Sequence, residues 1–111
     1  MNIPVATFSI VAYDPGRQEW GVAVQSKFLA CAAVVSWARA DAGAVATQSF
    51  ANVAYGADGL DMMARGATAE ETIRDLTTAD PQPNQRQVGV VDRQGRAAAY
   101  TGPECYDWAG H

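Results

Sequence analysis

A chain of 111 residues, 49% of them hydrophobic, is long enough for one domain with a buried core. Its net charge is −4 and its eight Lys and Arg residues are scattered, a pattern that disfavours nucleic-acid binding. No apolar run is long enough to span a membrane. We therefore expect neither nucleic acid nor a membrane as a partner.

Residues that bind metals and cofactors are sparse in this sequence. Cys31, Cys105 and His111 are too few for a zinc site, and each cysteine is expected to act as a small hydrophobic residue. The sequence contains no phosphate loop, no dinucleotide fingerprint and no G-x-S-x-G motif. We therefore expect no cofactor.

Residues 6–28 have the pattern of a β-hairpin. Residues 7–13 and 20–25 are apolar runs with β-branched and aromatic side chains, which favour strands. Asp14, Pro15 and Gly16 favour a turn, because proline presets φ, glycine accepts a positive φ and the Asp14 carboxylate can accept from backbone N–H groups. Residues 1–6 end in a small residue, as a cleavage site does, and are either a removable leader or an extension of the strand.

The middle of the chain is predicted to contain two strands and two helices. Residues 34–39 and 44–48 are the predicted strands, with a turn between them at residues 41–43. Leu60, Met63 and Ala64 recur at helical spacing and indicate a first helix, which Gly66 can end in the left-handed conformation.

The second helix has the clearest signal in the chain. Thr68 and Glu71 have the spacing of a capping box, and the Asp80-Pro81 pair is expected to end the helix. The side chains expected to face the core are those of Ala69, Ile73, Leu76 and Thr77.

A second hairpin is predicted near the end of the sequence. Residues 87–91 and 96–101 flank a short turn in which Gly95 suits the left-handed position. Blocks of strands on either side of a helical pair predict an α+β layered fold, formed by residues 1–111 as one domain.

Polar residues are expected to meet at one end of the first hairpin. Thr7 begins the first strand, while Gln25, Ser26 and Lys27 end the second, and these two ends are neighbours in an antiparallel pair. A lysine near Thr7 would lower the pKa of the hydroxyl and could hold a substrate carboxylate, and Ser26 could orient Thr7. The structural alternatives are a solvated lysine and a serine that caps the turn.

A second polar cluster lies between the fourth strand and the first helix. Its members are Thr47, Gln48, Ser49 and Asn52. Such a junction can offer fixed donors to a developing negative charge, and the amides of Gln48 and Asn52 could face a substrate amide or carboxylate. Satisfaction of buried backbone groups at a sharp turn is an equally good interpretation.

Several long blocks of the sequence resemble one bacterial protein family. ATFSIVAYDP, EWGVAVQSKF, WARADAGAVATQSFANVAYG, QVGVVDRQGRAAAYTG and CYDWAGH occur in this order and look like the family of domain of unknown function 1028. That family is similar to N-terminal-nucleophile (Ntn) hydrolases, so the resemblance implies a four-layer α-β-β-α sandwich with antiparallel sheets. Family members typically continue well beyond WAGH.

The resemblance also implies a function for Thr7. In an Ntn-type amidohydrolase, Thr7 would become the first residue after removal of residues 1–6, and its own α-amine would serve as the general base. Lys27 would tune the charge, and the Gln48–Ser49 segment would stabilise the oxyanion of a small amide or peptide-like substrate. The alternative is a non-catalytic ligand-binding or assembly domain with the same fold.

An incomplete sandwich would expose sheet edges and an apolar face. We therefore expect a protein partner as well as a small amide-containing ligand. The partner would be either the missing C-terminal half or another copy of the chain.

Overall fold

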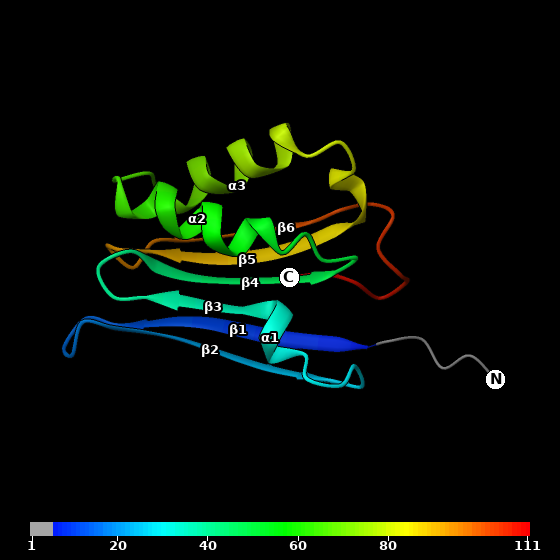
Figure 1. Ribbon diagram of the computed structural model, residues 1–111, viewed down its shortest axis with the longest axis horizontal. Coiled ribbons are helices and arrows are strands. Elements are labelled where there is room, and N and C mark those ends of the chain that lie inside the picture. Colours follow the sequence, from blue (N-terminus) through cyan, green and yellow to red (C-terminus); the bar gives the residue numbers. More distant parts are fainter. Residues whose placement is uncertain (1–5) are drawn as a thin grey trace.

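The structure, a computed structural model that describes residues 6–111, arranges the chain in three layers (Figure 1). A four-stranded antiparallel sheet lies in the middle, with two helices on one face and a two-stranded hairpin on the other. The α+β class and the antiparallel sheets are therefore confirmed, while the four-layer sandwich stays a prediction. Most of the proposed leader, residues 1–5, lies outside the described residues.

The elements follow the chain in nearly the predicted order. The strands are β1 (Thr7–Asp14), β2 (Glu19–Ser26), β3 (Ser36–Arg39), β4 (Gly43–Ser49), β5 (Arg86–Asp92) and β6 (Ala97–Thr101). The helices are α1 (Ala32–Val35), α2 (Ala54–Ala64) and α3 (Ala69–Ala79), with a 3-10 turn at Pro83–Gln85. None of these helices in residues 6–111 is long and apolar enough to cross a membrane.

The hairpin of β1 and β2 alternates strictly between two faces. Thr7 pairs with Ser26 and Asp14 with Glu19, without a bulge, so every second side chain faces the four-stranded sheet. The turn forms as expected around the Asp14 carboxylate, which accepts from the Gly16 and Arg17 N–H groups at 2.9 and 3.2 Å. The positive φ of this turn falls on Gln18, at 52°, and not on Gly16 as predicted.

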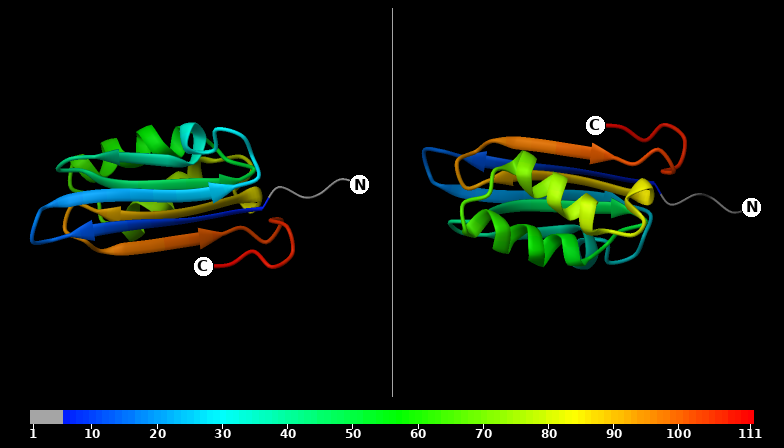
Figure 2. Two further views of the ribbon diagram at one scale, coloured as in Figure 1. Left: turned by 90° about the horizontal axis from the view of Figure 1, so that it is seen from below. Right: turned by 90° about the horizontal axis from the view of Figure 1, so that it is seen from above.

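The larger sheet has the order β3-β4-β5-β6. β1 packs under β4 and β5, and β2 under β3 and β4 (Figures 1 and 2). The predicted strand over residues 34–39 is partly wrong, because residues 32–35 form the short helix α1 and only residues 36–39 pair with β4. Trp37 explains this break, since its indole N–H donates to the Val34 carbonyl at 2.9 Å and closes the chain into a turn.

The two long helices supply the core on the far side of the sheet. α2 begins earlier than the periodicity indicates, at Ala54, because Tyr55 and Gly56 are buried against the sheet. The Gly56 position admits no side chain, since a Cβ there would lie 2.1 Å from the Trp37 ring. α3 begins with the predicted capping box of Thr68 and Glu71 and ends before Asp80.

A buried ionic network joins the end of α3 to the start of β5. The Arg86 guanidinium donates to both carboxylate oxygens of Asp80, at 2.8 and 3.2 Å, and the Tyr55 hydroxyl and Asn52 amide donate to the same carboxylate. The hydrogen bond from Arg86 holds the pKa of Asp80 well below its usual range. Burial, and then the Asp80 carboxylate, raise the pKa of Tyr55, so its hydroxyl stays protonated as a donor.

One buried hydroxyl on α3 has no partner among the described residues. Thr72 is completely buried, and its Oγ1 makes no hydrogen bond. A buried hydroxyl without a partner costs about 1–3 kcal/mol. We expect Thr72→Val, which keeps the shape of the side chain, to raise the free energy of unfolding by about 1 kcal/mol in urea titrations.

The same helix provides a matched control for this prediction. The Thr77 hydroxyl donates to the Ile73 carbonyl at 2.8 Å, so Thr77→Val removes a hydroxyl that has a partner and should not stabilise the fold. An unchanged or lower stability of Thr72→Val would show that its hydroxyl is satisfied in solution.

Candidate functional site

Thr7 lies at the start of β1, on the face that packs against the four-stranded sheet. Its Oγ1 is 2.7 Å from the Oγ of Ser26, the residue opposite it in the hairpin register. The Ser26 Oγ also accepts from the Phe28 N–H at 3.0 Å, which fixes the turn after β2. The predicted pairing of Thr7 with Ser26 therefore exists in the structure.

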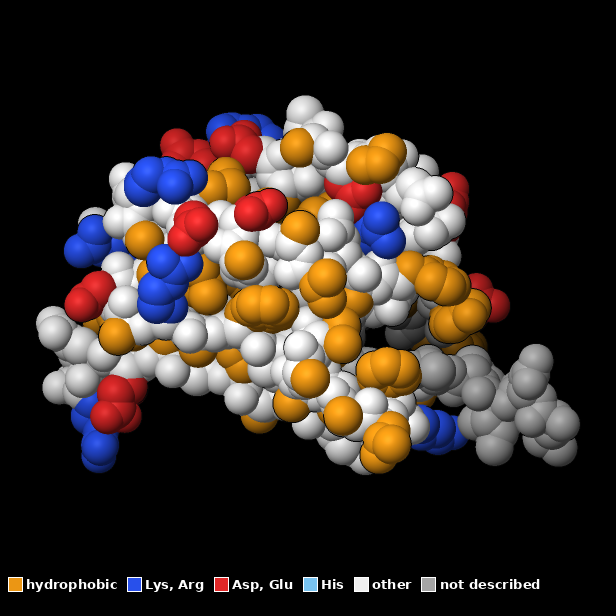
Figure 3. All heavy atoms as spheres, viewed as in Figure 1, with side chains coloured by type: hydrophobic (Ala, Val, Ile, Leu, Met, Phe, Trp, Pro, Cys, Tyr) orange, Lys and Arg blue, Asp and Glu red, His pale blue; other side chains and the backbone are white. Residues whose placement is uncertain are grey.

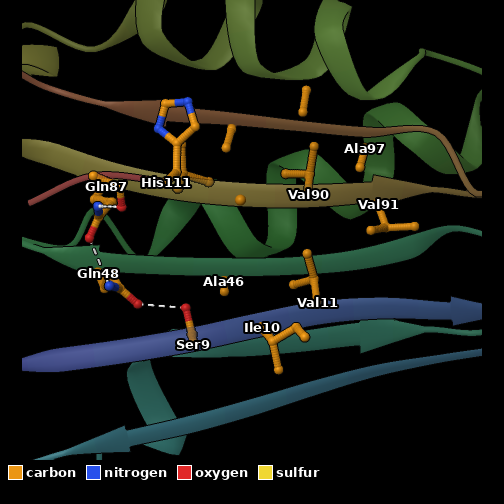
Figure 4. Close-up of a pocket in the computed structure, with 15 residues that line it drawn as sticks. Ser9, Ile10, Val11, Ala46, Gln48, Gln87, Val90, Val91, Ala97 and His111 are labelled. Atoms are coloured by element: carbon orange, nitrogen blue, oxygen red, sulfur yellow. Dashed lines mark hydrogen bonds between the residues drawn. The ribbon is translucent and has the colours of Figure 1, made fainter.

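Gln48 connects the hairpin to the four-stranded sheet. Its amide nitrogen donates to the Thr7 carbonyl at 3.1 Å. The same nitrogen donates to the Gln87 Oε1 at 2.7 Å, and the Gln48 Oε1 accepts from the Ser9 hydroxyl at 2.6 Å (Figure 4). Both amide hydrogens are thus used, and the side chain is only 8% exposed. Gln48 holds the backbone of Thr7 in place, and its amide has no hydrogen left for a substrate.

The hydrogen-bonded chain continues beyond Gln87. The amide nitrogen of Gln87 donates to the Thr101 hydroxyl at 3.0 Å and to the Gly110 carbonyl at 2.9 Å. The Thr101 hydroxyl lies 3.0 Å from His111 Nδ1. This contact holds His111 beside the sheet, and Figure 4 shows its side chain next to β5 and β6.

A cavity of about 630 Å³ opens beside Thr7. Thr7, Gln48, Ser49 and Gln87 form its polar part. Its wider walls are apolar and aromatic, and they include Phe28, Val34, Val35, Phe50, Tyr106 and Trp108. Figure 3 shows the mouth of this cavity, with hydrophobic side chains gathered around it. Among the described residues that line the cavity, Asp107 is the single Asp, Glu, Lys or Arg.

Ser49 offers a backbone donor to this cavity. The Phe50 N–H donates to the Gln85 carbonyl. In an antiparallel pair the N–H groups of successive residues point alternately toward the partner strand and away from it. The Gln48 N–H therefore points toward β5, and the Ser49 N–H points away from β5. Ser49 also has a φ of 69°, which turns the chain sharply at the cavity wall. The backbone donor expected from the Gln48–Ser49 segment is therefore available at Ser49 only.

Two of the predicted site residues lie on the opposite surface of the hairpin. Gln25 and Lys27 are exposed, whereas Thr7 and Ser26 face inward. The reason is the two-residue period of a strand, which places Gln25 and Ser26 on different faces although they are neighbours in sequence. The structure does not bring the Gln25 or Lys27 side chain to the cavity beside Thr7.

Thr47 and Asn52 lie on the helical side of the sheet. The Thr47 hydroxyl donates to the Asn52 carbonyl at 3.3 Å, and the Asn52 side chain accepts from the Ala54 N–H and donates to Asp80. These hydrogen bonds satisfy polar groups at the turn between β4 and α2. They agree with the interpretation that these residues stabilise a sharp turn. Neither residue lines the cavity beside Thr7.

The sequence patterns did not identify Gln87 or the aromatic wall as parts of the site. Ser9 follows Thr7 by two residues and so shares its face, which is a signal that the strand period provides. Gln87 lies opposite Gln48, but this pairing depends on the register of β4 with β5. No local pattern connects Phe50 with Tyr106, whose ring centroids are 5.7 Å apart.

The fold and the site define an antiparallel α+β layered protein with a threonine-centred polar site between its two sheets. The chain belongs to the DUF1028 family, a family of unknown function, whose model matches residues 7–111. A search among curated proteins finds no match.

A solved structure supports this assignment. The crystal structure of protein SPO2555 from Silicibacter pomeroyi, which has the same family model, is similar to this chain with a TM-score of 0.89 and 31% sequence identity. The match covers 94% of this chain and 46% of that protein. The present chain therefore spans about half the length of its solved relative.

Proposed function

We propose that this chain carries the nucleophile of an Ntn-type amide hydrolase. The observation that supports the proposal best is the position of Thr7. It begins β1, its hydroxyl lies 2.7 Å from Ser26 Oγ, and its backbone is held by Gln48 at the edge of the cavity.

The chemistry requires that Thr7 become the first residue of the mature chain. Its free α-amine would then have a pKa of about 7.7–8.0, close to working pH, and could accept the proton of the Thr7 hydroxyl. The oxygen attacks the carbonyl carbon of a substrate amide, and the proton passes to the departing amine. Water then hydrolyses the resulting ester and regenerates the hydroxyl.

Two groups of the site have supporting roles in this reaction. The Ser49 N–H points away from β5 at the cavity wall, where it can donate to the oxyanion of the tetrahedral intermediate. Ser26 orients the Thr7 hydroxyl, while its own oxygen is fixed by the Phe28 N–H. The aromatic walls accommodate an apolar part of the substrate amide.

Comparison of two forms of the chain tests this proposal. One form begins at Met1 and the other at Thr7, and each is treated with a β-lactone, which acylates activated hydroxyl groups. We expect intact-mass spectrometry to show one adduct on the form that begins at Thr7, with a rate that rises through pH 7.7–8.0 as the amine loses its proton. Equal labelling of the two forms, or none of either, would contradict the proposal.

The aromatic walls also favour a second function, that of a non-catalytic ligand-binding domain. Phe50, Tyr106 and Trp108 are 47%, 57% and 102% exposed, so a ligand could cover much apolar surface without any reaction. Saturable binding of an amide that survives unchanged, together with absence of the covalent adduct, would support this function instead.

A further inference from the structure

Aromatic rings from three separate segments line the cavity beside Thr7. They belong to the segments that follow β2, β4 and β6, and they are Phe28, Phe50, Tyr106 and Trp108. All four side chains are at least 47% exposed, although aromatic side chains usually contribute strongly to a protein core. Hydrophobic side chains gather around the mouth of the cavity in Figure 3. The rings therefore have surface that a ligand can cover.

Hydrogen bonds to the backbone hold this aromatic wall in place. The Phe50 carbonyl accepts from the Arg86 guanidinium at 2.7 Å, and the Tyr106 carbonyl accepts from the Ala109 N–H at 3.2 Å. The Phe50 and Tyr106 rings are tilted by 59° to each other, with their centroids 5.7 Å apart. Rings that meet at such an angle keep part of their faces free, whereas a parallel stack covers them.

The ionisable groups at this cavity favour a positively charged ligand. Among the described lining residues, Asp107 is the single Asp, Glu, Lys or Arg, so the fixed charge there is negative. Lys27, which was expected to hold a substrate carboxylate, does not line the cavity. The Arg86 guanidinium reaches the Phe50 carbonyl, but the Asp80 carboxylate neutralises its charge. A carboxylate attracts a cation and repels an anion, so the cavity selects against acidic substrates.

We propose that this cavity binds amides that carry an alkylated ammonium group. The faces of aromatic rings attract cations, and aromatic cages are the usual recognition sites of quaternary ammonium groups. The amide lies at the polar part of the cavity with Thr7 and Ser49, and the ammonium group lies among the rings beside Asp107. The volume of about 630 Å³ is typical of a site for a small molecule. This inference rests on the proposed function, because it names the substrate class of the same site.

The test compares the binding of three small amides to the full chain that begins at Met1. All three have an acetamide group and a two-carbon spacer. They are (2-acetamidoethyl)trimethylammonium, its neutral carbon isostere N-(3,3-dimethylbutyl)acetamide, and 3-acetamidopropanoate. We expect the ammonium amide to bind about tenfold more tightly than the isostere, and the carboxylate to bind most weakly.

The tryptophan indole N–H signals in NMR titrations measure these affinities. Trp108 lines the cavity, so its signal should shift and saturate with the ammonium amide. Trp20 and Trp37 do not line the cavity, and their indole N–H groups donate to backbone carbonyls at 3.0 and 2.9 Å. Their signals should stay in place and serve as internal controls.

Two variants locate the cation within the cavity. Asp107→Asn removes the charge at nearly constant shape, so it should weaken binding of the ammonium amide about threefold to fivefold and leave the isostere unchanged. Tyr106→Leu keeps an apolar side chain but lacks the ring, so the preference for the ammonium amide over the isostere should fall about threefold. Asp58→Asn on α2 removes an exposed carboxylate outside the cavity and should change neither affinity.

The possible outcomes separate this inference from the proposed hydrolase activity. Equal affinity for the ammonium amide and its isostere, tighter binding of the carboxylate, or no saturable shift of the Trp108 signal would overturn the inference. A preference that survives both Asp107→Asn and Tyr106→Leu would overturn it as well. The β-lactone needs no cation, so covalent labelling without the preference would overturn the substrate class alone. A preference without labelling would support the cation site and contradict the hydrolase.

Discussion

Thr7→Ala is expected to abolish covalent labelling of the chain that begins at residue 7. The variant keeps the terminal amine but lacks the oxygen that would form the ester, so no ester adduct can arise at this position. Thr7→Ser keeps the hydroxyl and should retain labelling. Intact-mass spectrometry after β-lactone treatment measures both outcomes.

The fold should survive this substitution, which makes the result interpretable. The Ser26 hydroxyl loses its contact with Thr7 but keeps the bond from the Phe28 N–H, so no buried group is left without a partner. We expect a loss of at most about 1 kcal/mol in the free energy of unfolding. Thr78→Ala, on the exposed side of α3, is a matched control that should label like the unmodified chain. Undiminished labelling of Thr7→Ala would place the reactive group elsewhere.

Asp80→Asn is expected to lower the free energy of unfolding by about 3–5 kcal/mol. The Asp80 carboxylate is 1% exposed and receives two hydrogen bonds from Arg86, so its neutralisation leaves a largely buried guanidinium without its counter-charge. The Tyr55 hydroxyl also loses a charged acceptor. Urea denaturation at neutral pH measures the difference.

The effect of Asp80→Asn should depend on pH. The pKa of Asp80 is lower in the folded state than in the unfolded chain, so its ionised form contributes stability above the ordinary aspartate pKa of about 3.9. This contribution falls as the pH drops below that value, and the difference between the two proteins should shrink. A difference that stays constant down to pH 2 would show that the charge of Asp80 is not its cause.

Asp75→Asn removes an exposed ion pair and serves as the comparison for the buried pair of Asp80 and Arg86. Asp75 pairs with Arg74 at 2.9 Å, but the two side chains are 51% and 64% exposed. Pairs of this kind typically contribute less than about 1 kcal/mol. We therefore expect a change within about 0.5 kcal/mol, and a loss as large as that of Asp80→Asn would contradict the role given to burial.

Most of the secondary structure could be predicted because its signals are local. The capping box of Thr68 and Glu71 and the Asp14 turn use residues within a few positions of one another, and both form as expected. The prediction failed at residues 34 and 35, where the apolar run favoured a strand but the chain forms the end of α1. There the chain turns around the Trp37 side chain, a contact that strand propensity does not describe.

The sequence by itself determined the α+β class, both hairpins, the second helix and the closeness of Thr7 to Ser26, because each depends on short-range patterns. Only the tertiary structure decided which polar residues share the site. The alternation of β2 directs Gln25 and Lys27 away from Thr7, and the register of β4 with β5 joins Gln48 to Gln87. A one-residue shift in register reverses the face of every side chain in a strand, so the pairing between distant strands determines the membership of the site.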